Sequence, residues 1–438
     1  MAGLTAAPSP RLSGTVRVPG DKSISHRSLI VSALAIGRSH VSGLLEGEDV
    51  LATASALRAL GVGIERLDDH RWRVDGVGVG GLAEPDDVLD MGNSGTSARL
   101  LLGLLASHPI RAVMTGDASL RRRPMDRVTA PLAACGAQFE ARAGRFLPLT
   151  VTGATDPLPI DYTLQVASAQ VKSAILLAGL NAPGRTMVIE PVASRDHTER
   201  MLKAMGADLQ IEEDRAGRRI SVTGEAELRP IDWQVPGDIS SAAFPLVAGL
   251  LAQDGEVRIE SVGTNPLRTG ILEALEAMGA DVTLADHREM GGEPVADLIA
   301  RPSRLRAIDL DPVLAPRLID ECPILFVAAA FATGRSRFTG LEELRVKESD
   351  RITAMASGLA ACGVSVRELP DGLEIDGGPV AGGATITTHL DHRIAMSFTV
   401  LGLAAEAPVA LDDASPIATS FPGFVELMAG LGARLVTA

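Results

Sequence analysis

A short pattern occurs six times along this chain of 438 residues, and it limits the possible folds more than any other feature. Each copy is a helix-like segment that ends in an apolar residue, followed by Gly and then by Val or Ala. The six glycines are Gly61, Gly136, Gly206, Gly279, Gly363 and Gly432. Glycine is the expected residue after a helix end, because it takes the left-handed backbone conformation at no steric cost. A spacing of roughly 70 to 85 residues is too long for a solenoid repeat and suits a small folding unit.

A hairpin pattern follows each of the first five glycines. Two alternating apolar and polar runs flank a polar centre, such as Pro370-Asp371-Gly372. We therefore predict a folding unit with the order strand, helix, strand, helix, strand, strand.

A second echo relates the two halves of the chain. The segment Val18-Pro19-Gly20-Asp21-Lys22-Ser23 recurs as Val235-Pro236-Gly237-Asp238-Ile239-Ser240, about three repeats later. A single Pro-Gly-Asp would indicate only a turn. Two copies at this spacing instead predict paired crossover strands near 18–23 and 235–240, with the N-terminal strand completing the second domain.

Two domains of three units each follow from these repeats. We predict a discontinuous domain of residues 1–21 and 238–438, which carries both termini, and an inserted domain of residues 22–237. The fold class is α/β, and a cleft between two such domains is a natural ligand site.

The charge balance bears on the choice of ligand. Lys and Arg number 41 against 55 Asp and Glu, a formal net charge of −14. Such a balance repels polyphosphate backbones and argues against nucleic acid as a partner. An anionic small ligand would need locally concentrated cations.

The cysteines and the hydropathy of the chain favour a reducing compartment. Cys135, Cys322 and Cys362 lie far apart with no CxxC pair, which argues against a disulfide framework and a zinc site. There is no signal pattern at the N-terminus, and the apolar runs are far shorter than a membrane span. We expect a cytoplasmic protein that does not bind a membrane.

Several cations of the first half stand near predicted helix starts. Lys22, Ser23 and Arg27 combine a point charge, a hydroxyl and a planar fork, which suits phosphate or carboxylate; a solvated helix entry is the alternative. The segment Gly92–Arg99 reads as a Gly-rich loop that opens a buried helix and offers free N–H groups to an anion, or as simple capping. It lacks the P-loop pattern.

Further candidates follow along the first half. Arg121–Arg127 holds four arginines, of which Arg123 is the best candidate because Pro124 restricts it to an extended conformation. Ser168 and Gln170 stand near a helix start, where they cap the helix or donate to a ligand. Arg195 precedes another helix and, taken alone, reads as a surface residue.

The second half adds carboxylates to the cations. Asp320 precedes an apolar stretch, where a helix cap is the alternative interpretation. Lys347 and Arg351, four residues apart, are expected on one helical face with Glu348 beside them, an arrangement suited to proton transfer on an anionic substrate. Arg393, in Asp391-His392-Arg393, stands at another helix start.

Taken in order, these motifs closely resemble the 5-enolpyruvylshikimate-3-phosphate synthases, from Pro19 to beyond Phe421. The motifs that carry the resemblance are Pro19–Arg27, Gly92–Thr96, Arg123-Pro124, Ser168-Ala169-Gln170, Arg345–Arg351 and Asp391–Arg393. The resemblance implies the two-domain enolpyruvyl transferase fold, in which each domain has three βαβαββ repeats around a pseudo-three-fold axis, an inside-out α/β barrel. It also places the active site in the cleft between the domains.

The resemblance further implies a reaction and a set of site residues. The family transfers the enolpyruvyl group of phosphoenolpyruvate to the 5-hydroxyl of shikimate-3-phosphate, by addition and elimination, on the route to aromatic amino acids. The implied shikimate-3-phosphate contacts are Lys22, Ser23, Arg27, Ser168, Ala169, Gln170, Arg195, Asp320 and Lys347. The implied phosphoenolpyruvate contacts are Lys22, Gly95, Arg123, Gln170, Arg351 and Arg393. Catalysis is implied for Lys22, Asp320 and Glu348, with no metal and no organic cofactor.

Departures from the family pattern refine this assignment. Ala169, Glu343 and Thr419 stand where the best-known members have Ser, Asn and Lys, which places the chain nearer the second, often glyphosate-tolerant class. Gly95 leaves room for glyphosate, a possible inhibitor. We expect a monomer. The alternatives are a UDP-N-acetylglucosamine enolpyruvyl transferase, disfavoured by Ser23 and a cysteine-free arginine loop, and a non-catalytic anion-binding protein, disfavoured by the carboxylates.

Overall fold

The computed structural model describes residues 3–68, 71–215 and 217–437. Its residues cluster into two compact units. The terminal unit comprises residues 1–21, 236–289 and 294–438, and the inserted unit comprises residues 22–235 together with the short segment 290–293. No described helix is long and apolar enough to cross a membrane.

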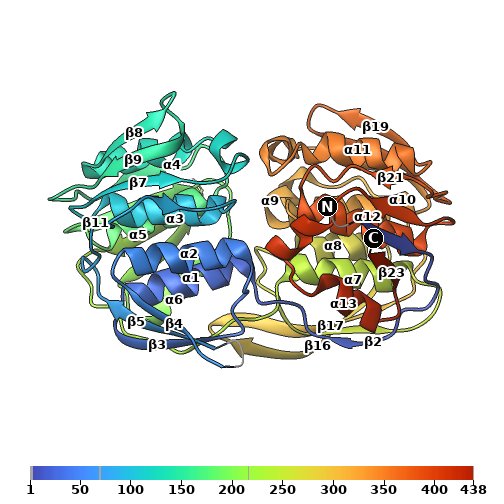
Figure 1. Ribbon diagram of the computed structural model, residues 1–438, viewed down its shortest axis with the longest axis horizontal. Helices are drawn as coiled ribbons and strands as arrows, with labels where there is room; N and C mark the ends of the chain where they lie inside the picture. The colour runs from blue at the N-terminus through green and yellow to red at the C-terminus, as the bar shows by residue number, and fades with distance from the viewer. Residues whose placement is uncertain (1–2, 69–70, 216, 438) are drawn as a thin grey trace. The chain divides into compact units, whose positions relative to one another are not determined.

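The inserted unit contains three sheets and six α-helices among its described residues (Figure 1). Its helices are α1 (Lys22–Ala33), α2 (Glu48–Ala59), α3 (Gly95–Ala106), α4 (Asp126–Leu132), α5 (Ala169–Gly179) and α6 (His197–Ala204). Its strands are β3 (Ile36–Ser42), β4 (Gly63–Arg66), β5 (Arg71–Val77), β6 (Leu89–Asp90), β7 (Arg111–Thr115), β8 (Gln138–Arg142), β9 (Phe146–Thr152), β10 (Asp161–Thr163), β11 (Arg185–Glu190), β12 (Leu209–Asp214), β13 (Gly217–Thr223) and β14 (Trp233–Gln234).

The terminal unit also contains three sheets. Its helices are α7 (Ile239–Leu251), α8 (Gly270–Ala277), α9 (Ala315–Leu318), α10 (Cys322–Ala330), α11 (Arg351–Ala361), α12 (His392–Ala404) and α13 (Phe424–Gly430). Its strands are β1 (Leu4–Ala7), β2 (Gly14–Val16), β15 (Val257–Gly263), β16 (Asp281–Met290), β17 (Glu293–Arg301), β18 (Gly334–Phe338), β19 (Ser365–Leu369), β20 (Gly372–Gly377), β21 (Thr385–Ile386), β22 (Val409–Leu411) and β23 (Arg434–Thr437). The tip of the β16–β17 hairpin is the segment that clusters with the inserted unit.

The same strand order recurs from sheet to sheet. In the inserted unit the orders are β14-β3-β5-β4, β6-β7-β9-β8 and β10-β11-β13-β12. Each begins with a short edge strand parallel to its neighbour and ends in an antiparallel hairpin. In the terminal unit the orders are β16-β17-β15-β2, β18-β20-β19 and β21-β22-β1-β23. The predicted βαβαββ order is followed along the chain by β6–β9 with α3 and α4, and by β10–β13 with α5 and α6. In the other four repeats, one strand comes from elsewhere in the chain or is absent from the described strands. The α/β fold class is confirmed.

The chain's own N-terminus completes the last repeat. Strand β1 lies between β22 and β23 and runs antiparallel to both, with Leu4 opposite Leu411 and Thr437. Both chain ends therefore lie in one sheet, and Figure 1 marks them close together. An antiparallel pair of strands from opposite ends of the sequence, β1 and β23, therefore takes the place of a sixth hairpin.

The two Pro-Gly-Asp segments pair with each other. Gly20 and Gly237 form an antiparallel bridge. The Asp21 amide donates to the Pro236 carbonyl at 2.7 Å, and the Asp238 amide donates to the Pro19 carbonyl at 2.9 Å. The two copies of the echo are thus held side by side within the terminal unit, where the chain leaves it and returns to it.

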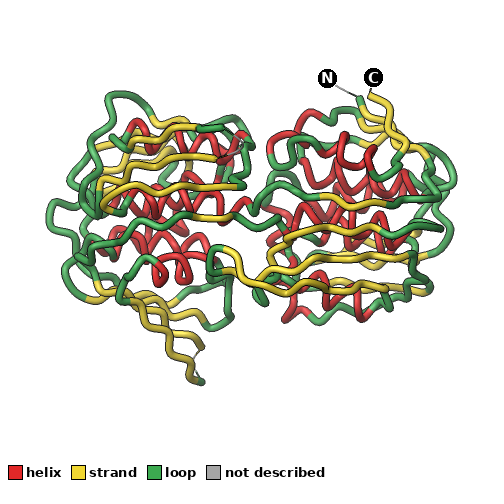
Figure 2. The backbone as a smooth tube through the Cα atoms, turned by 90° about the horizontal axis from the view of Figure 1, so that it is seen from below, coloured by secondary structure: helices red, strands yellow, loops and turns green. Residues whose placement is uncertain are grey.

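Helices form the interior of each unit, and sheets cover them. Figure 2 shows the helices enclosed by strands. Every residue of α10 is buried, and α3 and α5 pack on each other with most of their apolar residues buried. Small residues such as Gly103, where a Cβ would lie 2.3 Å from the Ala174 carbonyl oxygen, permit the close approach of α3 and α5. Each unit has its own apolar core.

All six repeat glycines adopt the left-handed conformation predicted for them. Their φ angles lie between the 83° of Gly279 and the 103° of Gly432. Gly136 is itself the C-terminal cap of a 3₁₀ turn, and each of the other five directly follows the C-terminal cap of an α-helix. The repeat signal therefore has a conformational cause.

We expect Gly279→Ala to destabilise the protein by about 1 kcal/mol, because a Cβ is strained at a φ of 83° although no atom lies within 4 Å of it. The matched control is Gly430→Ala, at the end of α13, where a Cβ also meets open space and φ is not positive. Thermal melting should show a lower midpoint for Gly279→Ala and an unchanged or higher midpoint for Gly430→Ala. Equal midpoints would contradict the conformational explanation.

Candidate functional site

Five of the predicted ligand contacts of the inserted unit stand in the first turns of three buried helices: Lys22, Ser23, Gly95, Ala169 and Gln170. In α1, α3 and α5 most residues are buried, and the residues left at least partly accessible cluster near the N-terminus. They are Lys22 and Ser23, Thr96 and Arg99, and Ala169 and Gln170. A helix N-terminus offers unpaired N–H groups and the positive end of the helix dipole. The accessible ends of these three helices therefore have the polarity that favours an anion.

A network of polar side chains joins the Gly-rich loop to the arginine loop. Arg123 donates from Nη2 to Asn93 Oδ1 at 2.9 Å and from Nη1 to the Asn93 carbonyl at 3.4 Å. Arg99 donates to Gln170 Oε1 at 3.0 Å, and Gln170 Nε2 donates to Thr96 Oγ1 at 3.0 Å. The structure thus brings the predicted residues Arg123 and Gln170 to one loop. As predicted, Arg123 has an extended backbone, with φ −81° and ψ 132°.

Gly95 lets two guanidinium groups approach the start of α3. A Cβ at this position would lie 2.8 Å from Arg99 Nη1 and 3.3 Å from Arg123 Nη1. The absence of a side chain at Gly95 therefore lets both guanidinium groups pack closely on the helix end. The other arginines of this loop, Arg121, Arg122 and Arg127, are exposed.

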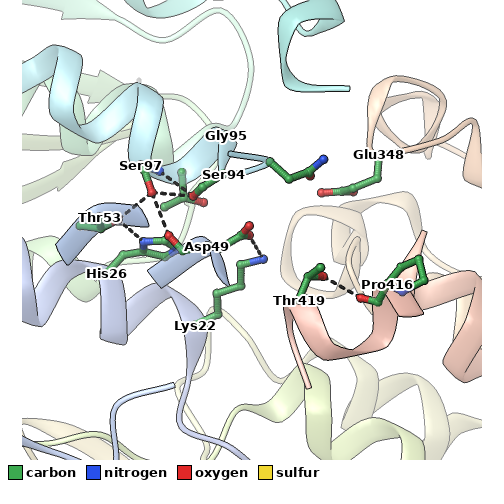
Figure 3. Close-up of polar contacts among 12 residues, drawn as sticks. Lys22, His26, Asp49, Thr53, Ser94, Gly95, Ser97, Glu348, Pro416 and Thr419 are labelled. Atoms are coloured by element: carbon green, nitrogen blue, oxygen red, sulfur yellow. Dashed lines mark hydrogen bonds and ion pairs between the residues drawn. The ribbon is translucent and has the colours of Figure 1, made fainter. Parts of the chain in front are cut away.

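Lys22 begins α1 and forms an ion pair with Asp49, near the start of α2 (Figure 3). The Lys22 side chain keeps 21% of its surface exposed. His26 instead turns into the interior, where its Nδ1 lies 2.7 Å from Thr53 Oγ1, and Thr53 Oγ1 lies 2.6 Å from Ser97 Oγ. This agrees with the interpretation of His26 as a structural residue.

Arg27 is almost completely buried and bonds to other parts of the inserted unit. It is 3% exposed and donates to Thr198 Oγ1 at 2.7 Å, to Ser173 Oγ at 2.9 Å and to the Ser23 carbonyl at 3.0 Å. These bonds tie α1 to α5 and α6. Its contact with shikimate-3-phosphate stays a prediction.

Ser168 and Arg195 complete the predicted contacts of the inserted unit. The Ser168 hydroxyl accepts from the Val171 amide at 3.4 Å and so caps α5, one of the two roles considered for it. Arg195 is partly exposed in the segment between β11 and α6. Its ligand role also stays a prediction.

The predicted residues of the terminal unit form one cluster around Arg351. Lys347 Nζ donates to Asp320 Oδ1 at 3.2 Å, and Arg351 Nη1 lies 3.8 Å from the same oxygen. Arg351 Nη2 donates to Glu348 Oε2 at 2.5 Å. Two cations and two carboxylates are therefore in direct contact.

The prediction that Lys347 and Arg351 share a helical face is wrong. Residues 342–346 form a 3₁₀ turn, Lys347 has an extended backbone, and α11 begins only at Arg351. The Asp350 side chain accepts from the Thr353 amide at 3.1 Å, which starts the helix after the charged run. Both side chains nevertheless lie at the same carboxylate, because Lys347 and Arg351 each contact Asp320 Oδ1.

Asp391 holds Arg351 in place from the start of α12. Arg351 Nε donates to Asp391 Oδ2 at 2.9 Å, and both side chains are at most 1% exposed. Burial by itself lowers the pKa of Arg351, but Asp391, Glu348 and Asp320 outweigh it and the pKa is raised. Burial raises the pKa of Asp391, but Arg351 outweighs it and the pKa is lowered. Both groups are therefore charged near neutral pH.

Arg393 is partly accessible in the first turn of α12. Its backbone amide donates to Asp391 Oδ1 at 2.9 Å. The position repeats the pattern of the inserted unit, a cation in the first turn of a buried central helix.

Sequence reasoning missed the groups that hold the predicted ones. These are Asn93, Thr96 and Arg99 on the Gly-rich loop, Asp49 beside Lys22, and Asp391 beside Arg351. Asp391, Asn93, Thr96 and Arg99 stood inside motifs already singled out. Asp49 had no local signal, because its partner lies in the preceding helix.

A further buried group lies beside the Pro-Gly-Asp pair. Arg268 Nη2 donates to Ser240 Oγ at 2.8 Å and lies 3.4 Å from Asp238 Oδ1 and 3.7 Å from Glu321 Oε1. Burial, followed by the charge of Asp21, raises the pKa of Asp238. The only hint in the sequence was that Asp21 and Asp238 occupy equivalent positions of the echo.

The three departures from the family pattern have different structural settings. Thr419 Oγ1 donates to the Pro416 carbonyl at 2.7 Å, so the side chain closes its own turn and supplies no cation (Figure 3). Ala169 is the first residue of α5, where its backbone amide belongs to the helix N-terminus. Glu343 lies in the 3₁₀ turn that precedes Lys347.

Comparison with known proteins defines the class to which this fold and these helix-end clusters belong. The structure is similar over the whole chain to that of the enolpyruvyl transferase NikO from Streptomyces tendae, with a TM-score of 0.77 at 19% identity, which shows a shared fold. It is also similar to the structure of EPSP synthase from Acinetobacter baumannii, with a TM-score of 0.89, 46% identity and full coverage of both chains.

The sequence comparisons are more specific. The family model for EPSP synthase (3-phosphoshikimate 1-carboxyvinyltransferase) matches residues 6–428. A 3-phosphoshikimate 1-carboxyvinyltransferase from Parvibaculum lavamentivorans is 59% identical and covers 99% of this chain and 97% of its own length. One from Sphingopyxis alaskensis is 60% identical, with 96% of each chain covered. The chain belongs to the EPSP synthase family of enzymes.

We expect Asp391→Asn to destabilise the protein by roughly 3 to 5 kcal/mol at pH 7, because it leaves the buried Arg351 without its main counter-charge. Asn still caps a helix well, so the change isolates the charge. The matched control is Asp376→Asn, which removes an exposed ion pair with Arg335 and should leave the melting midpoint nearly unchanged.

Acid should weaken this contribution. The pKa of Asp391 is lowered on folding, so its stabilisation is complete above the ordinary Asp pKa of 3.8 and is lost as the pH falls below it. The difference in melting midpoint between the wild type and Asp391→Asn should therefore shrink below about pH 4. A difference that grows in acid would contradict the charge assignment.

Proposed function

We propose that this chain transfers the enolpyruvyl group of phosphoenolpyruvate to the 5-hydroxyl of shikimate-3-phosphate and releases phosphate. The observation that carries the proposal is the match to the EPSP synthase family over residues 6–428, with relatives of that activity about 60% identical along nearly their whole length. This reaction belongs to the shikimate pathway, which leads to the aromatic amino acids.

The clusters of charge suit these two substrates. Each substrate carries a phosphate and a carboxylate, so bringing them together requires cations. In the proposal, Lys22, Gly95, Arg123, Gln170, Arg351 and Arg393 bind phosphoenolpyruvate. Lys22, Ser23, Arg27, Ser168, Ala169, Gln170, Arg195, Asp320 and Lys347 bind shikimate-3-phosphate. The first turns of α1, α3 and α5 add N–H groups that are already oriented, at no cost of reorganisation.

Both units contribute to one active site in this proposal. Residues 1–21 and 238–438 serve as one domain and residues 22–237 as the other, and the site lies in the cleft between them. The inserted unit carries the Lys22 ammonium, whereas the terminal unit carries the Asp320 and Glu348 carboxylates, so neither unit alone has all three groups. Exclusion of water on binding would strengthen every charged contact inside the site.

The proposed chemistry is addition followed by elimination. Asp320 accepts the proton of the 5-hydroxyl while the hydroxyl oxygen forms a bond to C2 of phosphoenolpyruvate. In the same step C3 takes a proton that Glu348 and Lys22 together supply. Loss of phosphate from C2 and of a proton from C3 then restores the enol ether. Asp320 Oδ1, the proposed general base, lies 3.2 Å from Lys347 Nζ and 3.8 Å from Arg351 Nη1. The reaction balances without an oxidant or reductant, so no cofactor is proposed.

The remaining predictions concern the setting of the enzyme. We propose a cytoplasmic monomer. We also propose glyphosate as an inhibitor, as the family resemblance implies.

An assay of phosphate release distinguishes the candidate activities. The protein is incubated with phosphoenolpyruvate and either shikimate-3-phosphate or UDP-N-acetylglucosamine. We expect phosphate only with shikimate-3-phosphate. Release only with the sugar nucleotide would reassign the acceptor, and no release with either would favour an anion-binding protein.

Lys22→Met should lower kcat by roughly a thousandfold or more, because it removes a cation that is proposed to contact both substrates and the transferred proton. The matched control is Lys203→Met on the exposed side of α6, which should retain normal kinetics. Thermal melting checks that both variants fold. Near-normal turnover by Lys22→Met would remove Lys22 from the site.

A further inference from the structure

A buried lysine lies within the α5 motif but is not used by the proposed reaction. Lys172 is completely buried, one turn into α5. Its Nζ lies 2.7 Å from Glu190 Oε2 and 2.7 Å from Glu199 Oε1. It also donates to the Ser194 carbonyl at 3.2 Å. The three N–H donors of the ammonium thus face acceptors from the end of β11, the β11–α6 segment and α6.

The contacts of Lys172 and Glu190 converge on one residue of the β11–α6 segment. Glu190 Oε1 accepts from the Ser194 amide at 3.0 Å, and Glu190 Oε2 accepts from the Ser194 hydroxyl at 3.1 Å. With the bond from Lys172 to the carbonyl, both backbone polar groups and the side chain of Ser194 are held. Arg195 is the next residue.

Stability alone does not account for this arrangement. Lys172, Glu190 and Glu199 are each at most 1% exposed, so a fully buried cation faces two buried carboxylates. The side chain of Arg218, which is 16% exposed, lies 3.7 Å from Glu190. Replacing such buried ions by apolar residues of similar volume is often neutral or stabilising. A role in fixing geometry explains why charges stand here.

We propose that Lys172, together with Glu190, is a positioning residue that fixes Arg195 for shikimate-3-phosphate. Lys172 joins two proposed parts of that binding site, because it stands on α5 after Ser168 and Gln170 and bonds to the residue before Arg195. It acts through the backbone of Ser194 and does not touch the substrate. The inference rests on the proposed function.

The neighbouring residue strengthens the same connection. Ser173 Oγ lies 2.7 Å from Thr198 Oγ1 on α6 and accepts from Arg27 on α1 at 2.9 Å. Consecutive residues of α5 therefore hold both the start of α6 and the segment before it. Arg195 is carried by a segment whose two ends are fixed to the helix that bears Gln170.

The test uses a charge-balanced variant. Lys172→Met combined with Glu199→Gln removes one buried charge of each sign, so that no additional net charge is left in the core. It should raise the KM for shikimate-3-phosphate about tenfold to a hundredfold, the loss expected when one charged hydrogen bond to the ligand is misplaced. The kcat and the KM for phosphoenolpyruvate should change by no more than about twofold. The matched control, Lys203→Met, should leave all three constants unchanged.

A mutant cycle separates positioning from general destabilisation. Arg195→Ala should show the same selective rise in KM, and adding it to the double variant should produce no further rise, because the two changes remove one interaction. Multiplicative effects in the combined variant, or an unchanged KM in the double variant, would overturn the inference. If the double variant does not fold, Glu190→Gln takes its place in the cycle with the same expectations, because an amide cannot accept on both sides from Ser194 and Lys172.

The two proposals fail in different ways. A wild-type protein that releases no phosphate from phosphoenolpyruvate and shikimate-3-phosphate would overturn the proposed function and this inference with it. Normal wild-type turnover, with no selective rise in KM in the folded variants, would overturn the inference alone.

Discussion

Burial of the central helix of each repeat is the constraint on which the rest of the structure depends. Sheets cover α1, α3 and α5 in one unit and α7, α10 and α12 in the other, and nearly every residue of these helices is buried. Where these helices of the inserted unit remain accessible, they do so mainly at their first turns. Helix N-termini favour negative charge, so the accessible ends of these helices suit the anion binding that is proposed for them.

Cations in these positions bring a second requirement, because buried or half-buried charges need partners. The protein meets it with carboxylates: Asp49 beside Lys22, Asp391 beside Arg351, and Glu190 and Glu199 beside Lys172. A buried ion pair adds little net stability compared with apolar packing. Its benefit is geometric, because several bonds to a guanidinium or ammonium fix its direction. The acidic composition of the chain is thus compatible with anionic substrates, since many carboxylates serve as supports for cations.

Residues of the candidate site could be predicted where they belong to a short sequence motif. Their interaction partners were harder to predict where these lie in a distant segment of the chain. The glycine-rich loop, the extended Arg123 and the capping by Ser168 could all be inferred from short segments. The prediction that Lys347 and Arg351 share a helical face was wrong. Asp350 caps α11, so the helix begins at Arg351 and does not include Lys347. Asp49 and Arg268 escaped notice, because each acts on residues brought near it by folding rather than by sequence spacing.

The sequence by itself determined the six repeats, their hairpins and their helix ends, because glycine conformation and alternation of apolar residues are local properties. It also determined the family, since the ordered motifs extend over nearly the whole chain. The sequence predicted that the N-terminal strand completes the second domain, but only the tertiary structure decided that β1 lies between β22 and β23. It alone also decided that Lys172 holds the residue before Arg195. These contacts join segments far apart along the chain or on separate elements, and their energy depends on burial and direction, which no local pattern encodes.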